Sequence, residues 1–272
     1  MTLAIQLEAT SAGALGVSLV NILSFSRDLN YLTSSEPGLI WKRLSERSPE
    51  SGLDSVLRNA SLVIPSGSKV GTYGRTGSGK STFLLTLLRM AEIEDGDVLV
   101  DGVSLLTIAR NIVRQRIFTM PQELILLPGT IRYNVDPFSK HPDEVILSAL
   151  TEVGIWDTIS AHGGLESPAE KIPLSRGQQQ LFCLACAILS KSRLVLLDEI
   201  TSNVDAATEA RMMDVVNRKL SGRTILAVAH HLRTIRDFDL IIVLDQGKII
   251  ESGSPDRLLQ QPSTFRAMWE LQ

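Results

Sequence analysis

A glycine-rich segment of eight residues, GRTGSGKS, has the residue types that hold phosphate groups. Its glycines let the backbone curl so that successive N–H groups point inward, and a helix starting at the end of the loop adds partial positive charge. The lysine would reach the β and γ phosphates of a nucleoside triphosphate, and the serine hydroxyl would be a ligand of Mg²⁺. The residues expected to contact the nucleotide are Gly74, Arg75, Thr76, Gly77, Ser78, Gly79, Lys80, Ser81 and Thr82.

Two adjacent acids, Asp198 and Glu199, follow an unbroken apolar run that begins at Leu194. Such a run predicts a strand buried on both faces, with its terminal carboxylate at the edge of the sheet where open α/β sheets bind ligands. Asp198 would hold the Mg²⁺ through water, and Glu199 would polarise the attacking water as a general base. An acid pair alone is usually a solvated turn, but downstream of a phosphate loop it indicates hydrolysis.

The elements that must position these residues alternate short β-type runs with longer helical patterns, starting near Ser55. This alternation predicts parallel strands joined by crossover helices. The expected strands cover residues 69–73, 98–100, 116–120, 193–198, 224–228 and 240–244. The expected helices cover residues 81–90, a helical insertion at 143–163, residues 179–190 and a helical tail at 255–272.

The composition limits the class of partner. A net charge of −3 and a pI near 5.9 give no electrostatic reason to expect nucleic acid as a partner. The two cysteines, Cys183 and Cys186, are too few for a disulfide framework and suit a reducing compartment. Their spacing invites a zinc or redox interpretation, but two packing cysteines on a helix are the better account because no second pair of ligands lies nearby.

The first fifty residues divide into two segments. Residues 1–26 end in an uncharged run from 9 to 26, which just reaches the length of a membrane-spanning helix and would fit a soluble or interfacial helix as well. Residues 27–54 are polar, contain Pro37 and Pro49, and are predicted to be a linker. The main domain is predicted at residues 55–272.

Further motifs carry a resemblance to ATP-binding cassette (ABC) proteins. Residues 174–180, LSRGQQQ, resemble that family's signature, and residues 202–205 resemble its D-loop. The resemblance implies that the signature and the D-loop act on nucleotide held by a second cassette, through Ser175, Gly177, Gln178 and Asp205. It also implies that Gln122 contacts Mg²⁺ and water, and that His230 contacts the γ-phosphate as a switch histidine.

The resemblance implies a fold, cofactors and partners. The fold is a P-loop NTPase of the α/β class with a mainly parallel central sheet, an antiparallel N-terminal β portion and a helical signature subdomain at about 123–190. ATP and Mg²⁺ are the expected cofactors; a second cassette and transmembrane domains are the expected partners. Residues 121–138 are similar to the second cassette of C-type, multidrug-resistance-associated exporters, especially fungal ones. On this basis residues 1–26 would be the end of the last transmembrane helix of such an exporter. The chain would then work at a membrane, with the cassette on the cytoplasmic side.

The sequence departs from the family upstream of the phosphate loop. Arg47 stands about where the family has the Tyr that stacks on adenine, and Trp41 or Tyr31 could replace it only if the linker folds back. An arginine guanidinium stacking on the base is the other option. The linker also looks shortened, which suggests a lost segment. Arg176, Cys186 and His231 are smaller departures around the motifs.

Three functions remain open from the sequence. The leading hypothesis is an exporter cassette that hydrolyses ATP at a site shared with a second cassette. A catalytically impaired remnant would explain the shortened linker and the missing stacking residue. A soluble ABC ATPase that remodels nucleic acid or ribosomes is less favoured, because the chain has one cassette and no basic patch.

Overall fold

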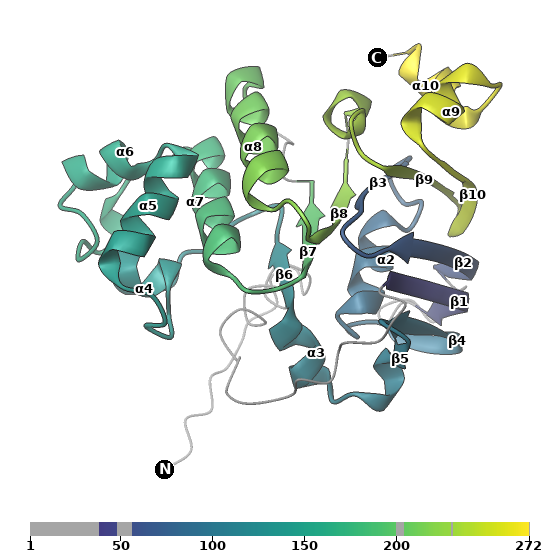
Figure 1. The fold of residues 1–272 in the computed structure, drawn as a ribbon, viewed down its shortest axis with the longest axis horizontal. Helices are drawn as coiled ribbons and strands as arrows, with labels where there is room; N and C mark the ends of the chain where they lie inside the picture. Colours follow the sequence, from purple (N-terminus) through teal and green to yellow (C-terminus); the bar gives the residue numbers. More distant parts are fainter. Residues whose placement is uncertain (1–37, 48–55, 200–203, 230, 272) are drawn as a thin grey trace.

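A computed structural model describes residues 38–47, 56–199, 204–229 and 231–271. The predicted N-terminal helix, Tyr31, Ser202, Asn203 and His230 lie outside these ranges. Within them the chain forms two sheets and a group of helices that extends to one side of the larger sheet (Figure 1). No helix in the described ranges has both the length and the apolar character that crossing a bilayer requires.

The larger sheet has six strands in the order β10-β9-β3-β8-β7-β6. The pairs among β9, β3, β8, β7 and β6 are parallel, and β10 pairs antiparallel with β9. The prediction of a mainly parallel central sheet is therefore confirmed. The strands are β3 (Lys69–Gly74), β6 (Ile117–Met120), β7 (Leu194–Asp198), β8 (Thr224–Val228), β9 (Leu240–Asp245) and β10 (Lys248–Gly253).

The smaller sheet is antiparallel, in the order β2-β1-β4-β5, and it confirms the predicted N-terminal β portion. Its strands are β1 (Gly38–Arg47), β2 (Leu57–Pro65), β4 (Glu92–Val100) and β5 (Val103–Ser104). The observed strand β4 has nine residues, whereas the prediction covered only residues 98–100. Strand β10 was not predicted.

The predicted linker at 27–54 is wrong for Gly38–Arg47, because these residues are strand β1 in the interior of the smaller sheet. Trp41 anchors this strand: it is 1% exposed and stacks on Phe83, with ring centroids 4.6 Å apart. The Trp41 Nε1 also donates to the Thr86 hydroxyl at 3.4 Å. The strand was not predicted because polar and apolar residues are mixed in its sequence. Its pairing with β2 and β4 depends on residues far along the chain.

Helices cover the faces and the side of the larger sheet. Those of the core are α2 (Lys80–Leu87), α3 (Arg110–Arg116), α8 (Ala206–Lys219), α9 (Pro255–Gln260) and α10 (Thr264–Trp269). Those within the predicted helical subdomain are α4 (Ile131–Val135), α5 (Asp143–Val153), α6 (Trp156–Ala161) and α7 (Arg176–Leu189). Three short 3₁₀ turns are η1 (Leu105–Thr107), η2 (Ala169–Lys171) and η3 (Leu232–Ile235).

Two hydrophobic cores lie on opposite faces of the larger sheet. Along β7, Val195 and Leu197 enter the core shared with the helical subdomain, and Leu194 and Leu196 enter the core under the smaller sheet. This alternation follows from the two-residue period of a strand. The apolar run of β7 is thus buried on both faces, as predicted, and holds Asp198 rigidly at its end.

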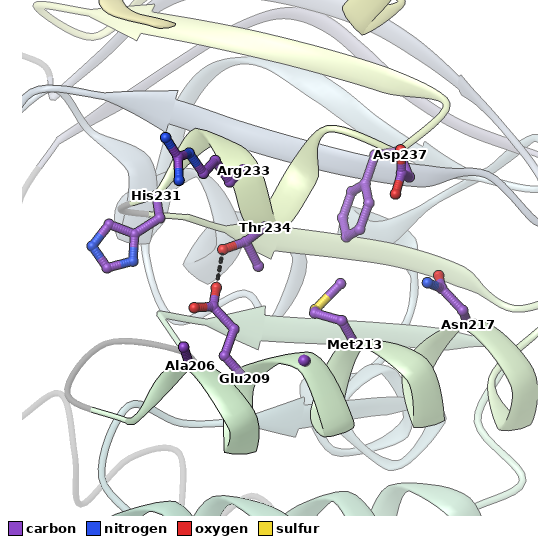
Figure 2. Close-up of a pocket in the computed structure, with 10 residues that line it drawn as sticks. Ala206, Glu209, Met213, Asn217, His231, Arg233, Thr234 and Asp237 are labelled. Carbon is purple, nitrogen blue, oxygen red and sulfur yellow. Dashed lines mark hydrogen bonds between the residues drawn. The ribbon is translucent and has the colours of Figure 1, made fainter. Parts of the chain in front are cut away.

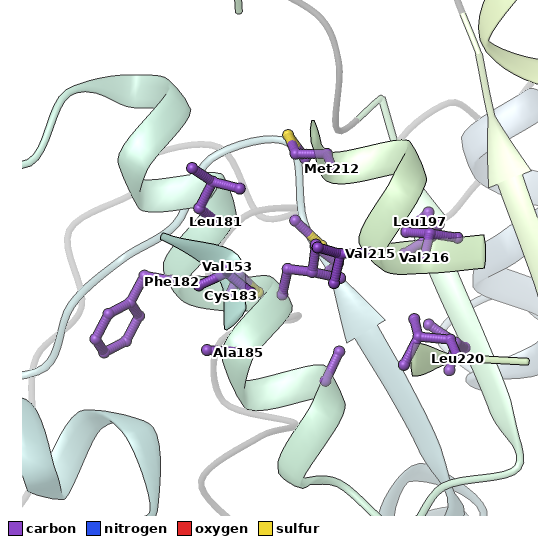
Figure 3. Close-up of a cluster of buried hydrophobic side chains, with 14 of the residues drawn as sticks. Val153, Leu181, Phe182, Cys183, Ala185, Leu197, Met212, Val215, Val216 and Leu220 are labelled. Carbon is purple, nitrogen blue, oxygen red and sulfur yellow. The ribbon is translucent and has the colours of Figure 1, made fainter. Parts of the chain in front are cut away.

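The two cysteines belong to the packing of α7. Cys183 lies in the buried cluster between α7, α8 and β7, among Val153, Met212 and Val215 (Figure 3). Burial raises the pKa of the Cys183 thiol well above its usual range and that of Cys186 to about 12. Among the described residues there is no group of three or more His, Cys, Asp or Glu side chains placed to hold a metal. The burial of Cys183 agrees with a packing role for this cysteine.

Replacement of Trp41 tests the correction to the linker. We expect Trp41→Ala to lower the free energy of unfolding by about 3–5 kcal/mol, the usual cost of deleting a buried aromatic side chain. Urea denaturation measures this change, and the exposed neighbour Lys42 provides the control Lys42→Ala. A loss below about 1 kcal/mol for Trp41→Ala would mean that β1 is not part of the core.

Candidate functional site

The carboxyl ends of the parallel strands bring the predicted catalytic segments to one edge of the larger sheet. Strand β3 ends at Gly74, where the phosphate loop begins, and β7 ends at Asp198. Strand β8 lies between these two, and β6, which precedes Gln122, is the next neighbour of β7. Segments that are far apart in the sequence therefore meet because their strands are parallel and adjacent.

The phosphate loop is held in a tight curve by its glycines. A Cβ at Gly74 would lie 2.2 Å from the Leu244 carbonyl oxygen, so no larger residue fits there. Gly79 has a φ of 100° at the N-cap of α2, a conformation that L side chains rarely adopt. The Gly247 N–H donates to the Ser78 carbonyl at 3.1 Å and supports the loop from the β9–β10 turn.

Lys80 turns back across this loop. Its ammonium donates to the carbonyl oxygens of Gly74 at 2.8 Å and Arg75 at 3.1 Å. Lys80 is buried, whereas Arg75, Thr76 and Gly77 are exposed at the rim of the loop. Burial lowers the pKa of the Lys80 ammonium, while the negative charges of Glu199 and Asp198 act in the opposite direction. The lysine thus lies close enough to both acids to sense their charge.

Ser81 and Asp198 meet across 117 positions of sequence: the serine hydroxyl donates to Asp198 Oδ1 at 3.4 Å. A hydroxyl and a carboxylate facing each other are the hard oxygen donors that Mg²⁺ prefers. A Mg²⁺ that bridges substrate phosphates takes few protein ligands, so this pair fits the ion without a larger acidic cluster.

Glu199 takes an unusual backbone conformation just after β7. Its φ is 53°, in the left-handed region that costs a residue with a Cβ roughly 1–2 kcal/mol. The Glu199 N–H donates to the Val228 carbonyl at 3.1 Å, which fixes this turn against the end of β8. Strain of this kind collects at functional sites, where the surrounding structure can maintain it.

The predicted signature residues form the start of α7. Ser175 is the N-cap: its Oγ accepts from the Gln178 N–H at 3.2 Å, and its own N–H donates to Gln178 Oε1 at 2.9 Å. Gln178 also donates through Nε2 to the Thr158 hydroxyl on α6 at 3.1 Å. Ser175 is exposed, and Gln178 is partly buried because its side chain serves this capping box.

Asp205 lies beside the signature within the same chain. It caps α8, accepting from the Thr208 N–H at 3.0 Å and the Thr208 hydroxyl at 2.6 Å, and these bonds lower the pKa of the Asp205 carboxyl. A Cβ at Gly177 would lie 3.1 Å from Thr208 Cγ2 and 3.6 Å from Val204 Cγ1. The N-terminal turns of α7 and α8 are therefore packed together, and glycine permits that approach.

A hollow of about 580 Å³ lies between α8 and the segment that follows β8 (Figure 2). Its lining includes none of the predicted site residues, so we assign no nucleotide to it. The Thr234 hydroxyl donates to the Glu209 carboxylate across the hollow and ties η3 to α8. The residues that line it are Ala206, Glu209, Ala210, Met213, Asn217, His231, Arg233, Thr234, Asp237 and Phe238.

One contact near the site was not predicted from the sequence. The buried side chain of Gln180, on α7, donates through Nε2 to the carbonyl oxygens of Gln122 at 2.5 Å and Pro121 at 3.3 Å. Gln122 itself is exposed. The run of three glutamines after the signature contained this residue, but its spacing alone could not show which glutamine faces the loop after β6.

The position of Trp41 also answers a question that the sequence left open. Because its ring is buried under the smaller sheet against Phe83, Trp41 cannot stack on adenine. Tyr31, the other aromatic candidate, lies outside the described residues.

Comparisons with known proteins agree with this geometry. Residues 57–202, more than half of the chain, match the family model described as ABC transporter. The chain is 45% identical over 212 residues to "ABC multidrug transporter B" of Aspergillus fumigatus, a match that covers 78% of this chain and 14% of that protein. It is 37% identical over 258 residues to "ATP-binding cassette sub-family C member 2" of Rattus norvegicus, covering 90% of this chain and 17% of that protein.

A solved structure shows the same fold. The chain superimposes with a TM-score of 0.80 and 26% identity on the structure titled "Structure of a bacterial Atm1-family ABC exporter with ATP bound". This match covers 95% of the chain described here and 46% of the exporter chain. The chain also spans only 14% to 20% of the length of the first two curated relatives. The fold is that of an ABC-transporter P-loop NTPase, and the chain belongs to the ABC transporter family.

Proposed function

We propose that this chain binds and hydrolyses Mg·ATP and drives transport as the motor cassette of an exporter. The observation that carries the proposal is the meeting of Lys80, Ser81, Asp198 and Glu199 at the carboxyl edge of the larger sheet. These are the groups that phosphoryl transfer to water requires: a cation on the phosphates, oxygen ligands for a metal and a base for water.

Each residue has a distinct task in this proposal. The N–H groups from Gly74 to Thr82 bind the phosphates, and Lys80 exchanges its two carbonyl partners for phosphate oxygens. Ser81, Asp198 and Gln122 hold Mg²⁺, which when bound neutralises phosphate charge. Glu199 orients and deprotonates the attacking water, and its fixed backbone turn limits the positions that its carboxylate can take. His230 contacts the γ-phosphate.

The site is completed by a second cassette. Ser175, Gly177, Gln178 and Asp205 belong to the start of α7 and α8, and Ser175 and Asp205 are exposed there. The start of α7 faces solvent, and its partial positive charge would attract a phosphate bound to another molecule. We propose that these residues close on the ATP held by the partner cassette, so that each site is shared.

Likeness to whole exporters supports the wider setting. The relatives include a protein named as a multidrug transporter and one named as a member of sub-family C. We propose that the chain is the second cassette of a C-type exporter, joined to transmembrane domains, with ATP hydrolysis on the cytoplasmic side.

A catalytically impaired cassette is the second candidate, since one specific observation favours it. Burial of Trp41 removes a replacement for the adenine-stacking residue. The phosphate side of the site contains every expected residue type, so this candidate differs from the first in base recognition and turnover, not in phosphate binding.

Replacement of Glu199 tests the assignment of the base. Glu199→Gln should retain ATP binding but slow steady-state ATP turnover by about 10²–10⁴-fold, the usual contribution of a general base. The exposed acid Glu144 supplies the control Glu144→Gln, which should hydrolyse ATP normally. Turnover by Glu199→Gln within twofold of the unmodified chain would remove Glu199 from this role.

Lys80→Ala distinguishes binding from chemistry in the same assay. Loss of the ammonium should weaken ATP binding by about tenfold or more, equivalent to about 1.4 kcal/mol. Lys248→Ala, at an exposed position on β10, controls for the loss of one positive charge. Equal ATP affinity in Lys80→Ala and Lys248→Ala would overturn the phosphate-loop assignment.

Competition between ATP and tripolyphosphate measures how much the base contributes. Because Trp41 is buried, we expect affinity to come mainly from the phosphates and Mg²⁺, with tripolyphosphate displacing ATP at a dissociation constant within about tenfold of that of ATP. Trp41→Phe should leave both affinities unchanged. Failure of tripolyphosphate to compete would show that an adenine contact dominates binding.

A further inference from the structure

Two hydrogen bonds from Gln180 connect the loop that carries Gln122 to the signature helix, α7. The Gln180 Nε2 donates to the Gln122 carbonyl at 2.5 Å and to the Pro121 carbonyl at 3.3 Å, although 58 and 59 positions separate these residues in sequence. The loop follows β6, and the side chain of Gln180 reaches it from α7. The contact therefore joins the larger sheet to the helical subdomain.

The other end of the same loop is also held by side-chain hydrogen bonds. Asn134, on α4, accepts from the Leu127 N–H at 2.7 Å and donates to the Leu127 carbonyl at 3.0 Å. Gln180 and Asn134 thus hold the loop at its two ends. Because Gln180 is bonded to the Gln122 carbonyl itself, it restrains the position of the Gln122 backbone.

Gln180 lies only five residues beyond Ser175, on the same 14-residue helix. Five residues of α-helix span about 7.5 Å, and a helix of this length moves as one rigid element. A displacement of Gln122 would therefore be transmitted through Gln180 to Ser175 and Gly177. A displacement of the signature would travel the opposite way by the same contact.

Gln180 is a poor choice of residue if only packing were needed at this position. It is 5% exposed, and its Oε1 has no hydrogen-bond partner among the described residues. A buried acceptor without a partner costs free energy, whereas Met or Leu would fill the same space without that cost. A requirement for the two donated hydrogen bonds explains why an amide is present.

We propose that Gln180 is a positioning residue that sets Gln122 for Mg·ATP and couples this loop to the signature that acts on the partner cassette. The proposal rests on the function proposed above, because it assigns Gln122 and Ser175 to nucleotide sites. Gln180 touches neither substrate nor metal; it acts through the backbone of Gln122 and through α7.

The first test measures the loop directly, without ATP turnover. In Gln180→Met the two donated hydrogen bonds are lost at nearly constant volume, so the NMR backbone order parameters of residues 122–126 should fall below about 0.6, the range of flexible backbone. Gln179→Met is the matched control, because its Nε2 donates to the Leu174 carbonyl at 3.2 Å and not to this loop. Unchanged order parameters at residues 122–126 in Gln180→Met would overturn the proposal.

The second test is a double-mutant cycle in steady-state ATP turnover by the full chain. Gln180→Met should lower kcat about tenfold or more and leave ATP affinity within twofold, and adding Gln122→Ala should cause little further loss. Additive losses would show that Gln180 acts on something other than Gln122 and would contradict the proposal. If Gln180→Met does not fold, Gln180→Leu, which also lacks the donor, takes its place in both tests.

The two tests keep the proposal separate from the proposed function. An unmodified chain without ATP turnover would count against the exporter cassette, while the order parameters of the loop would still decide whether Gln180 holds it. An active chain with unchanged order parameters and unchanged kcat in Gln180→Met would refute the coupling and leave the proposed function standing.

Discussion

Parallel pairing of β3, β8, β7 and β6 is the constraint on which the rest of this molecule depends. It places the ends of β3 and β7 at one edge, so that the Lys80 ammonium and the Ser81 hydroxyl face the acids that follow β7. Burial of both faces of the sheet, by the smaller sheet on one side and the helical subdomain on the other, keeps this edge rigid. The chemistry proposed for the site requires that rigidity, since phosphoryl transfer is catalysed mainly by positioning and charge.

Helix α7 links parts of the site that the sheet does not. Its capped start presents Ser175, its fifth residue, Gln180, holds the loop of Gln122, and its buried face carries Cys183 into the core. Gly177 lets the same helix approach α8 where Asp205 caps it. The helical subdomain is thus connected to the sheet by specific polar contacts in addition to hydrophobic packing.

Elements defined by local patterns could be predicted from the sequence. Strand β8 was predicted with its observed bounds, and β7 to within one residue, because an unbroken apolar run between polar segments is typical of a buried parallel strand. The phosphate loop and the acid pair were found because their chemistry requires fixed residue types at fixed spacing. The closeness of Ser81 to Asp198 confirms that these two segments meet.

Features set by distant contacts could not be predicted in this way. Strand β1 has Lys42 and Arg43 beside Trp41, so its pattern resembles a linker until its pairing with β2 and β4 is known. The role of Gln180 depends on the packing of α7 against the loop after β6. The sequence shows three consecutive glutamines, and no local pattern indicates which of them contacts this loop. The shared ATP site remains a prediction drawn from the signature and the exposed start of α7.

A complementation measurement tests the shared site most directly. Chains carrying Lys80→Ala keep their signature, and chains carrying Ser175→Arg keep their phosphate loop, so each variant alone should be nearly inactive. Mixed in equal amounts, half of the dimers should contain one intact composite site, and ATP turnover should recover to about a quarter of the unmodified rate. A mixture no more active than the two variants measured separately would contradict the claim that each ATP is held between two cassettes.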